Sequence, residues 1–327
     1  MAYNAKIFNG LSVAIEHRYY GVSQPFNSLT TDNLKYLSSE QALADTAELI
    51  MYLGKQYKID HGKWVVFGGS YAGNLAAWFR EKYPDLCKGA IASSAPVEAV
   101  VDFPDYLGVT SESLGAECSE SISVVQAPSS DIKGFCKLAT DRTGGVLAVD
   151  SYGKALKDHV NGRCFEFKYD KWVENVKETT LTSETVTRGT RQWIYQTCTE
   201  FGYYGTTNKP DTPFGKDSLP LDYFTQLCTD IFGPQITAQT IVKAVEVTNK
   251  YYGGRQPNVT NVVFTNGSLD PWHALSITKN LNNSTLAITI DGQSHWTDMW
   301  EPSPDLPKSL SDAYDLITKQ VDQYLNA

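Results

Sequence analysis

A serine within a run of small residues is the first feature of this 327-residue chain that could carry out chemistry. Ser70 lies in KWVVFGGSYAGNLAAWF, where an apolar, strand-like run leads through a tight turn into a helical pattern. A nucleophilic serine in such a turn is strained and needs small neighbours two residues away, here Gly68 and Ala72. The pattern predicts a nucleophile elbow, in which the N–H of Tyr71 helps to bind an oxyanion. The alternative is a glycine-rich turn that only packs closely, or that binds phosphate without the usual lysine.

An acid and a base follow the serine in the order that this chemistry uses. Asp270 and His295 come just after two apolar, β-branched runs, at residues 261–265 and 285–290. Because catalytic groups of parallel α/β sheets collect at the carboxyl ends of strands, we expect both side chains beside the serine. The imidazole would take the serine proton, and the carboxylate would fix the tautomer of the imidazole. The sequence therefore predicts a catalytic triad of Ser70, Asp270 and His295.

Other histidines and acids are expected to be structural. A lone histidine more often serves packing than catalysis, and four have less suitable positions: His17, His61, His159 and His273. Asp291 is too close to His295 in sequence to approach it from a separate strand end. Asp298 follows His295 by three residues, and we expect it to support the loop.

The elements that position these residues are expected to be strands alternating with helices. Such alternation predicts a parallel sheet, with early strands expected at residues 11–15, 64–67 and 89–94. A helix is expected to begin after Ser38, which has capping-box spacing to Gln41, and a second is expected over residues 71–83. The parallel pattern returns at residues 261–265 and 285–290, and a helical stripe over residues 310–325 ends the chain.

The middle of the chain has a different character. Residues 103–254 are irregular, rich in aromatic residues, and contain five of the six cysteines. Because strand patterns on both sides are needed to complete one sheet, we interpret this stretch as an insertion. The predicted fold is α/β: an α/β-hydrolase core of residues 1–102 and 255–327, with a mainly parallel sheet, and an inserted, mostly helical cap of residues 103–254.

The composition excludes several classes of protein. A net charge of −9 without a block of Lys or Arg argues against nucleic-acid binding. No apolar run approaches the roughly 20 residues that span a bilayer, and the first 21 residues lack the layout of a signal peptide. We therefore expect neither nucleic acid nor membrane as a partner.

The cysteines predict disulfides rather than a metal site. Their spacing contains neither C-x-x-C nor H-E-x-x-H, so we expect no bound metal; the pairing stays open, and free buried thiols are the alternative. The sequence also contains N-x-S/T sequons, which matter only in the secretory route. They lie at Asn258, Asn266, Asn282 and Asn283.

Seven motifs in order resemble the family of prolyl carboxypeptidase, dipeptidyl peptidase II and thymus-specific serine protease. They are EHRYYGVSQPF at 16–26, EQALAD at 40–45, GGSYAGNLAAWF at 68–79, ASSAPV at 92–97, RQWIYQTCTEFGYY at 191–204, NGSLDPWHALS at 266–276 and GQSHWTDM at 292–299. The sequences R-Q-W and D-P-W-H-x-L-S within these motifs are most similar to the thymus-specific branch.

This resemblance implies a serine peptidase with a helical cap, acting on peptides without a cofactor. Members with known specificity favour proline before the scissile bond, act from a chain end, and work in acidic endosomal, lysosomal or secreted settings. By motif position, Ser70 is the nucleophile, Asp270 the acid and His295 the base. The alternatives are an esterase on the same scaffold and a peptide-binding paralogue without turnover. A homodimer is possible.

A pocket that selects proline is expected to have flat aromatic walls, because proline is a compact apolar ring without an N–H. Trp272 adjoins the predicted acid, and the first motif and the cap supply further substrate-binding candidates: Glu16, Tyr19, Tyr20, Trp193, Tyr203 and Tyr204. Either Tyr19 or Tyr20 could instead serve as an oxyanion donor.

The beginning of the chain departs from the family pattern. Family members carry several strands upstream, one ending in a T-G-N-E-G-like loop, whereas only ten residues precede the expected strand at residues 11–15. Loss of that strand would leave unpaired backbone groups and remove an oxyanion donor worth about 2.7–4 kcal/mol. We therefore expect a fragment or mispredicted product of a longer secreted enzyme. The mild change to Ala72, where the family has glycine, is the other departure.

Overall fold

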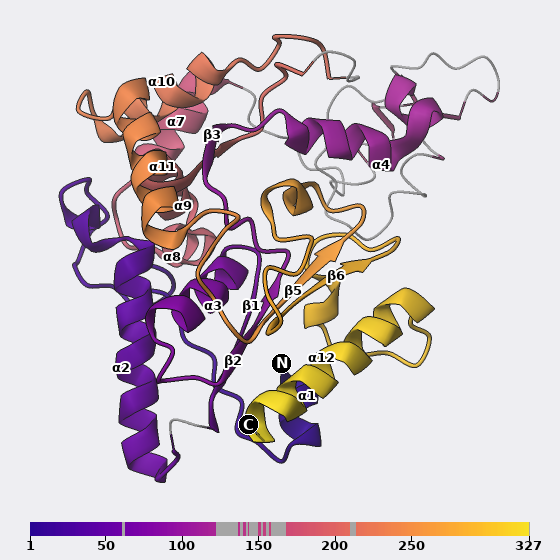
Figure 1. Ribbon diagram of the computed structural model, residues 1–327. Helices are drawn as coiled ribbons and strands as arrows, with labels where there is room; N and C mark the ends of the chain where they lie inside the picture. Colours follow the sequence, from indigo (N-terminus) through magenta and orange to yellow (C-terminus); the bar gives the residue numbers. More distant parts are fainter. Residues whose placement is uncertain are drawn as a thin grey trace.

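A four-stranded parallel sheet forms the centre of the protein in the computed structural model, which describes residues 1–60, 63–121, 168–209 and 214–326 and isolated positions from 137 to 157 (Figure 1). The strand order is β1-β2-β5-β6, and every neighbouring pair is parallel. Its strands match four of the five runs expected from the sequence: β1 (Val65–Gly69), β2 (Gly89–Ser93), β5 (Val262–Gly267) and β6 (Thr285–Ile290).

Helices cover both faces of this sheet. Alternate residues point to opposite faces, so Ala92 and Phe264 pack on the side of α3, whereas Ile91 and Val263 pack against α12. α2 packs on the outside of α3, and α1 lies beside α12, close to both chain ends (Figure 1). The bounds are α1 (Ala2–Ile7), α2 (Ser39–Tyr57), α3 (Tyr71–Lys82) and α12 (Lys308–Asn326), with a short 3-10 helix η1 (Asn33–Tyr36) before α2.

The expected helix starts are confirmed where they depend on local chemistry. Ser38 has extended backbone, and its side chain accepts a hydrogen bond from the N–H of Gln41, so α2 begins at the predicted cap. α3 begins immediately after Ser70. Within the described ranges, no helix is long and apolar enough to cross a membrane.

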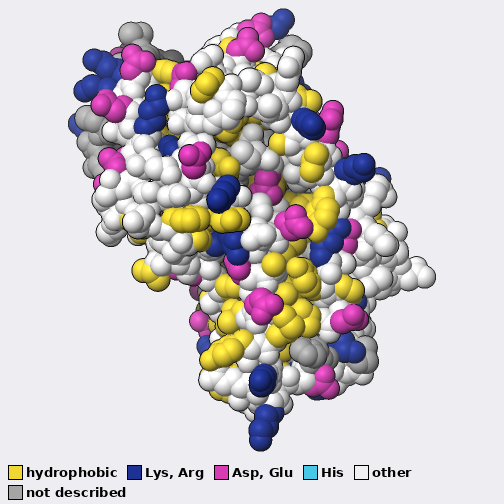
Figure 2. All heavy atoms as spheres, turned by 90° about the vertical axis from the view of Figure 1, so that its left-hand side faces the viewer, with side chains coloured by type: hydrophobic (Ala, Val, Ile, Leu, Met, Phe, Trp, Pro, Cys, Tyr) yellow, Lys and Arg dark blue, Asp and Glu magenta, His cyan; other side chains and the backbone are white. Residues whose placement is uncertain are grey.

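The strand expected at residues 11–15 is wrong. These residues have no regular structure, and Leu11 and Ile15 are exposed. A cavity of about 620 Å³ separates the segment from β1, and Phe67 of β1 and Ile50 of α2 also line it. Apolar, β-branched residues form a strand only where another strand pairs with them, and in the described part of the chain β1 pairs with β2 alone. Figure 2 looks onto the α2 side and shows hydrophobic side chains gathered in the lower half of this face.

The cap lies above the carboxyl ends of the strands and has its own core. A parallel pair, β3 (Val100–Asp102) and β4 (Gly202–Tyr204), connects it to the sheet domain. Its other described elements are α4 (Asp105–Ser121), α7 (Tyr169–Lys177), α8 (Ser183–Arg188), α9 (Thr190–Gln196), the π-helix η3 (Thr197–Phe201), α10 (Leu221–Phe232) and α11 (Ala238–Tyr252) (Figure 1).

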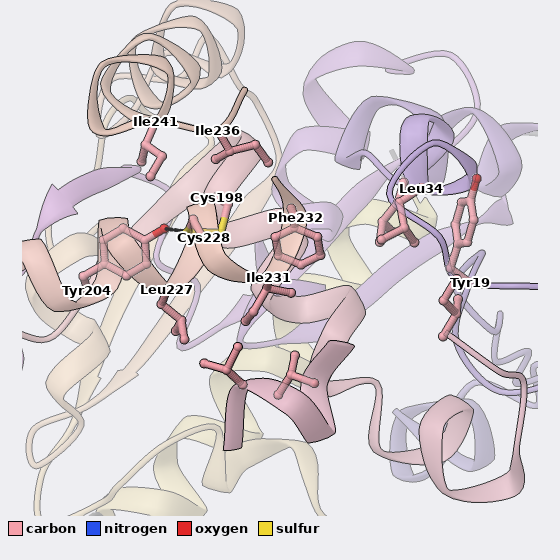
Figure 3. Close-up of a cluster of buried hydrophobic side chains, with 14 residues drawn as sticks. Tyr19, Leu34, Cys198, Tyr204, Leu227, Cys228, Ile231, Phe232, Ile236 and Ile241 are labelled. Atoms are coloured by element: carbon pink, nitrogen blue, oxygen red, sulfur yellow. Dashed lines mark hydrogen bonds between the residues drawn. A yellow bond between two sulfur atoms is a disulfide. The ribbon is translucent and has the colours of Figure 1, made fainter. Parts of the chain in front are cut away.

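One disulfide fastens the core of the cap. Cys198 and Cys228 are joined with an S–S distance of 2.00 Å, among the apolar side chains of α10 and its neighbours (Figure 3). The expectation of disulfides is confirmed for this pair, whereas Cys87 is a buried free thiol. The side chains of the remaining cysteines lie outside the described residues: Cys118, Cys136 and Cys164.

Candidate active site

Ser70 occupies a strained turn between β1 and α3. Its backbone has φ 59° and ψ −131°, a conformation that non-glycine residues rarely adopt. A Cβ at Gly68 would lie 1.8 Å from the carbonyl oxygen of Ala72, and one at Gly73 would lie 2.7 Å from that of Ser93. Both glycines are therefore required by the turn. Ala72 is exposed, which explains why alanine is tolerated where the elbow pattern has glycine.

Asp270 and His295 meet across the ends of β5 and β6. The carboxylate of Asp270 is fully buried, and its Oδ2 lies 2.9 Å from Nδ1 of His295. Its Oδ1 accepts the N–H of Trp272 at 3.0 Å, at the start of the 3-10 helix η4 (Pro271–Leu275). An ionised carboxylate only accepts hydrogen bonds, so Nδ1 carries the proton, and Nε2 of the neutral ring is free to accept one.

The loop that carries His295 is attached to the neighbouring strand ends by Asp298, in the 3-10 helix η5 (Thr297–Met299). The carboxylate of Asp298 accepts the hydroxyls of Ser93 at 2.5 Å and Thr265 at 2.7 Å. Burial raises the pKa of this carboxyl. A Cβ at Gly69 would lie 3.1 Å from Cβ of Trp296, so the loop also passes close to the Ser70 turn.

The structure thus brings the three predicted catalytic residues to one edge of the sheet, but Ser70 and His295 are not hydrogen-bonded to each other. Among the described residues, the Ser70 hydroxyl makes no hydrogen bond to the imidazole of His295. Bonds between a nucleophile and its base are often long in free enzymes and tighten when substrate binds. The arrangement is suited to acyl transfer.

The rival residues have other surroundings. His17 contacts the carbonyl of Arg18 and the hydroxyl of Tyr71, and Nδ1 of His273 is buried without a hydrogen-bond partner in the described chain. Asp291 is exposed and lies 3.4 Å from the hydroxyl of Ser268. His61 and His159 fall outside the described residues. Within the described ranges no group of three or more His, Cys, Asp or Glu could hold a metal ion.

An aromatic wall runs from the base to the residue after the nucleophile. Trp272 lies 6.2 Å from the ring of His295 and 5.4 Å from Tyr203, measured between ring centroids. The wall consists of five rings: Trp272, Tyr203, Phe201, Trp193 and Tyr71. Three of the predicted substrate-binding candidates therefore belong to one cluster, in which Trp272, Trp193 and Tyr71 are partly exposed and Tyr203 is buried. Phe201, which lies in the motif TEFGYY, is fully buried and supports the partly exposed rings from behind.

The other four candidates lie elsewhere. Tyr19 is fully buried and donates its hydroxyl to the carbonyl of Asn33, and Tyr204 packs in the cap core near Cys228 (Figure 3). The carboxylate of Glu16 accepts two N–H groups of its own loop, from residues 22 and 23. Tyr20 bonds to a cap residue; together with Glu16 it lines the cavity that also reaches Ser70. None of these four joins the aromatic wall.

The parallel sheet, the strained serine turn and the cap over the strand ends define an α/β-hydrolase. Comparison with known proteins identifies the family: the model of "Serine carboxypeptidase S28" matches residues 1–128 and 123–317. The chain belongs to this family of serine peptidases.

Two curated relatives illustrate the family. Human thymus-specific serine protease is 33% identical, over 98% of this chain and 75% of its own length. Human lysosomal Pro-X carboxypeptidase is 29% identical, over 90% of this chain and 71% of its own. Among solved structures, the proline iminopeptidase of Mycobacterium smegmatis aligns over 93% of this chain and 77% of its own at 13% identity and a TM-score of 0.38, from which no functional conclusion follows.

Proposed function

We propose that the protein is a serine exopeptidase that cleaves peptide bonds after proline through an acyl-enzyme. The observation that carries the proposal is the hydrogen bond between Asp270 and His295 at the same sheet edge as the strained Ser70. Nε2 of His295 takes the proton of Ser70 as its oxygen attacks the carbonyl, and then gives it to the leaving amine. Water completes the cycle by the same route.

The aromatic wall is the proposed selector of proline. Trp272 presents a flat, partly exposed apolar face beside His295, and the buried rings of Tyr203 and Phe201 pack behind it. A proline ring has no N–H that would need a partner at such a face. The similarity to a relative named as a Pro-X carboxypeptidase supports this assignment. Peptides are therefore the proposed substrates.

A secreted or lysosomal location is proposed from two features. Disulfides such as Cys198–Cys228 persist in oxidising compartments, and one relative is named as lysosomal. Among the sequons, Asn258, Asn282 and Asn283 are exposed, whereas Asn266 is buried in β5 and donates a hydrogen bond to the carbonyl of Ile277. A glycan on the folded protein is thus expected at the exposed positions only.

A peptide-binding protein without turnover is the second candidate function. α/β-Hydrolases take one oxyanion N–H from a loop near the nucleophile strand, and here the cavity of about 620 Å³ reaches Ser70 beside β1. If the N–H of Tyr71 acted without such a partner, the oxyanion would lose about 2.7–4 kcal/mol of stabilisation. This candidate predicts peptide binding with little hydrolysis.

A substrate panel separates these functions. The purified chain is given peptides with proline or alanine before the scissile bond, each free or blocked at either end, and short esters; Ser70→Ala is the control. Proline-dependent hydrolysis that needs one free end and disappears in Ser70→Ala supports the proposal. Cleavage of esters alone would indicate an esterase, and peptide binding without hydrolysis would indicate the second candidate.

A further inference from the structure

The hydroxyl of Tyr71 lies in a buried hydrogen-bonded chain that joins the cap to the nucleophile helix. Tyr71 is the first residue of α3 and follows Ser70 directly. Nε2 of Gln196 donates to its hydroxyl at 2.9 Å, and Nε2 of His17 lies 3.1 Å away on the other side. Gln196 is fully buried and is the last residue of α9, so the contact crosses from the cap to the core.

The donors and acceptors of this chain have one consistent direction. Nδ1 of His17 lies 2.7 Å from the carbonyl oxygen of Arg18, which can only accept, so Nδ1 carries the proton. Nε2 of the neutral ring therefore accepts the hydroxyl proton of Tyr71. The oxygen of Tyr71 then accepts the N–H of Gln196, whose Oε1 accepts the hydroxyl of Tyr20 at 2.7 Å. Burial lowers the pKa of His17, which agrees with a neutral ring.

This series of hydrogen bonds ends at the carboxylate of Glu200, which binds the start of α2. The carboxylate of Glu200 accepts the N–H of Ser39 at 3.0 Å and its hydroxyl at 2.7 Å, and Nε2 of Gln196 lies 3.4 Å from Oε2 of Glu200. Because Ser39 is the first residue of α2, the carboxylate lies at the positive end of that helix. Glu200 belongs to the π-helix η3, a form that occurs frequently at functional sites.

We propose that Gln196 is a positioning residue for catalysis, acting through the Tyr71 hydroxyl. This inference rests on the proposed serine peptidase function. Phe201 and Trp193 pack against the ring of Tyr71 at centroid distances of 5.3 and 5.7 Å. The hydrogen bonds of its hydroxyl to Gln196 and His17 further restrict the rotation of this side chain. A fixed ring holds the backbone N–H of Tyr71, the proposed oxyanion donor, in place beside Ser70. The cap thereby influences the geometry at the nucleophile.

The test is a double-mutant cycle with Tyr71→Phe and Gln196→Met, which remove the hydrogen bond but keep the volume of each side chain. Each single variant is expected to lower kcat for a proline peptide about tenfold, with KM changed less than about twofold, because a slightly misplaced donor mainly affects the transition state. If both act through the same bond, the double variant is no slower than the slower single variant.

Tyr169→Phe is the matched control. It removes a tyrosine hydroxyl that donates to Asp230 at 2.7 Å within the cap, away from the aromatic wall. Its Tm is expected to fall with kcat unchanged, and Tm of all variants identifies any effect of stability. Unchanged kcat in Tyr71→Phe and Gln196→Met, or effects that multiply in the double variant, would overturn the proposal.

The rate of Ser70 labelling by a fluorophosphonate separates this inference from the proposed function. If the wild type labels but does not cleave proline peptides, the proposed function fails, and slower labelling of both single variants still supports the positioning role. If the wild type cleaves these peptides and both variants match it, only the positioning role fails. A wild type that neither labels nor cleaves overturns both.

Discussion

Replacing Asp270 by asparagine should abolish nearly all turnover while leaving the fold intact. The asparagine oxygen can still accept the N–H of Trp272, now held at 3.0 Å. Its NH₂ group then faces Nδ1 of His295 at the position that Oδ2 occupies 2.9 Å away. Because NH₂ only donates, the imidazole must move its proton to Nε2, which can no longer accept from Ser70. The expected loss in kcat is roughly 10⁴-fold, or about 5.5 kcal/mol.

The assay is kcat on a proline peptide, paired with thermal unfolding. Asp298→Asn is the matched control, because Asp298 is also a buried acid on the same edge but contacts the hydroxyls of Ser93 and Thr265. Losing one acceptor there should lower the free energy of unfolding by about 1–3 kcal/mol, with a much smaller effect on kcat than Asp270→Asn has. A larger kcat loss in Asp298→Asn would refute the assignment of the acid.

Three further predictions concern the wall, the turn and pH. Trp272→Ala should lower the ratio of kcat/KM for proline over alanine peptides; an unchanged ratio would exclude Trp272 as a specificity wall. Gly68→Ala should lower Tm and abolish serine labelling because its Cβ would lie 1.8 Å from the carbonyl of Ala72, whereas Ala72→Gly should behave as wild type. Burial lowers the pKa of His17, so the unfolded chain binds a proton there first as pH falls below about 6.5, and stability declines toward acid. In urea unfolding between about pH 5 and 7, His17→Gln should weaken this decline, and an identical pH dependence would contradict the argument.

The elbow and the Asp270–His295 pair could be predicted because short-range chemistry determines them. Gly68 and Gly73 surround Ser70 in sequence, and the turn has no room for a side chain at either glycine. The two runs before Asp270 and His295 are apolar and β-branched, so each residue was expected at a strand end. Because β5 and β6 are parallel neighbours, their carboxyl ends lie side by side. This places Asp270 and His295 close enough to form their hydrogen bond.

Features that depend on long-range partners could not be predicted in the same way. Residues 11–15 have strand-like composition, but composition cannot show whether a strand will pair with them. The contact between Tyr71 and Gln196 joins residues 125 apart in sequence. Tyr204 is in the same motif as Tyr203, yet it points into the cap core while Tyr203 joins the aromatic wall. Tyr203 has φ 66°, so the backbone turns between these neighbours, and a motif alone does not show which side chain lies near the active site.

The most direct test of the catalytic assignment is labelling with a fluorophosphonate probe, followed by mass spectrometry of the labelled peptide. We expect a single label on Ser70, none in Ser70→Ala, and strongly slowed labelling in His295→Ala. His273→Ala, which replaces the histidine three residues past the acid, should label as the wild type does. A label on another residue, or labelling that needs His273 and not His295, would contradict the assignment.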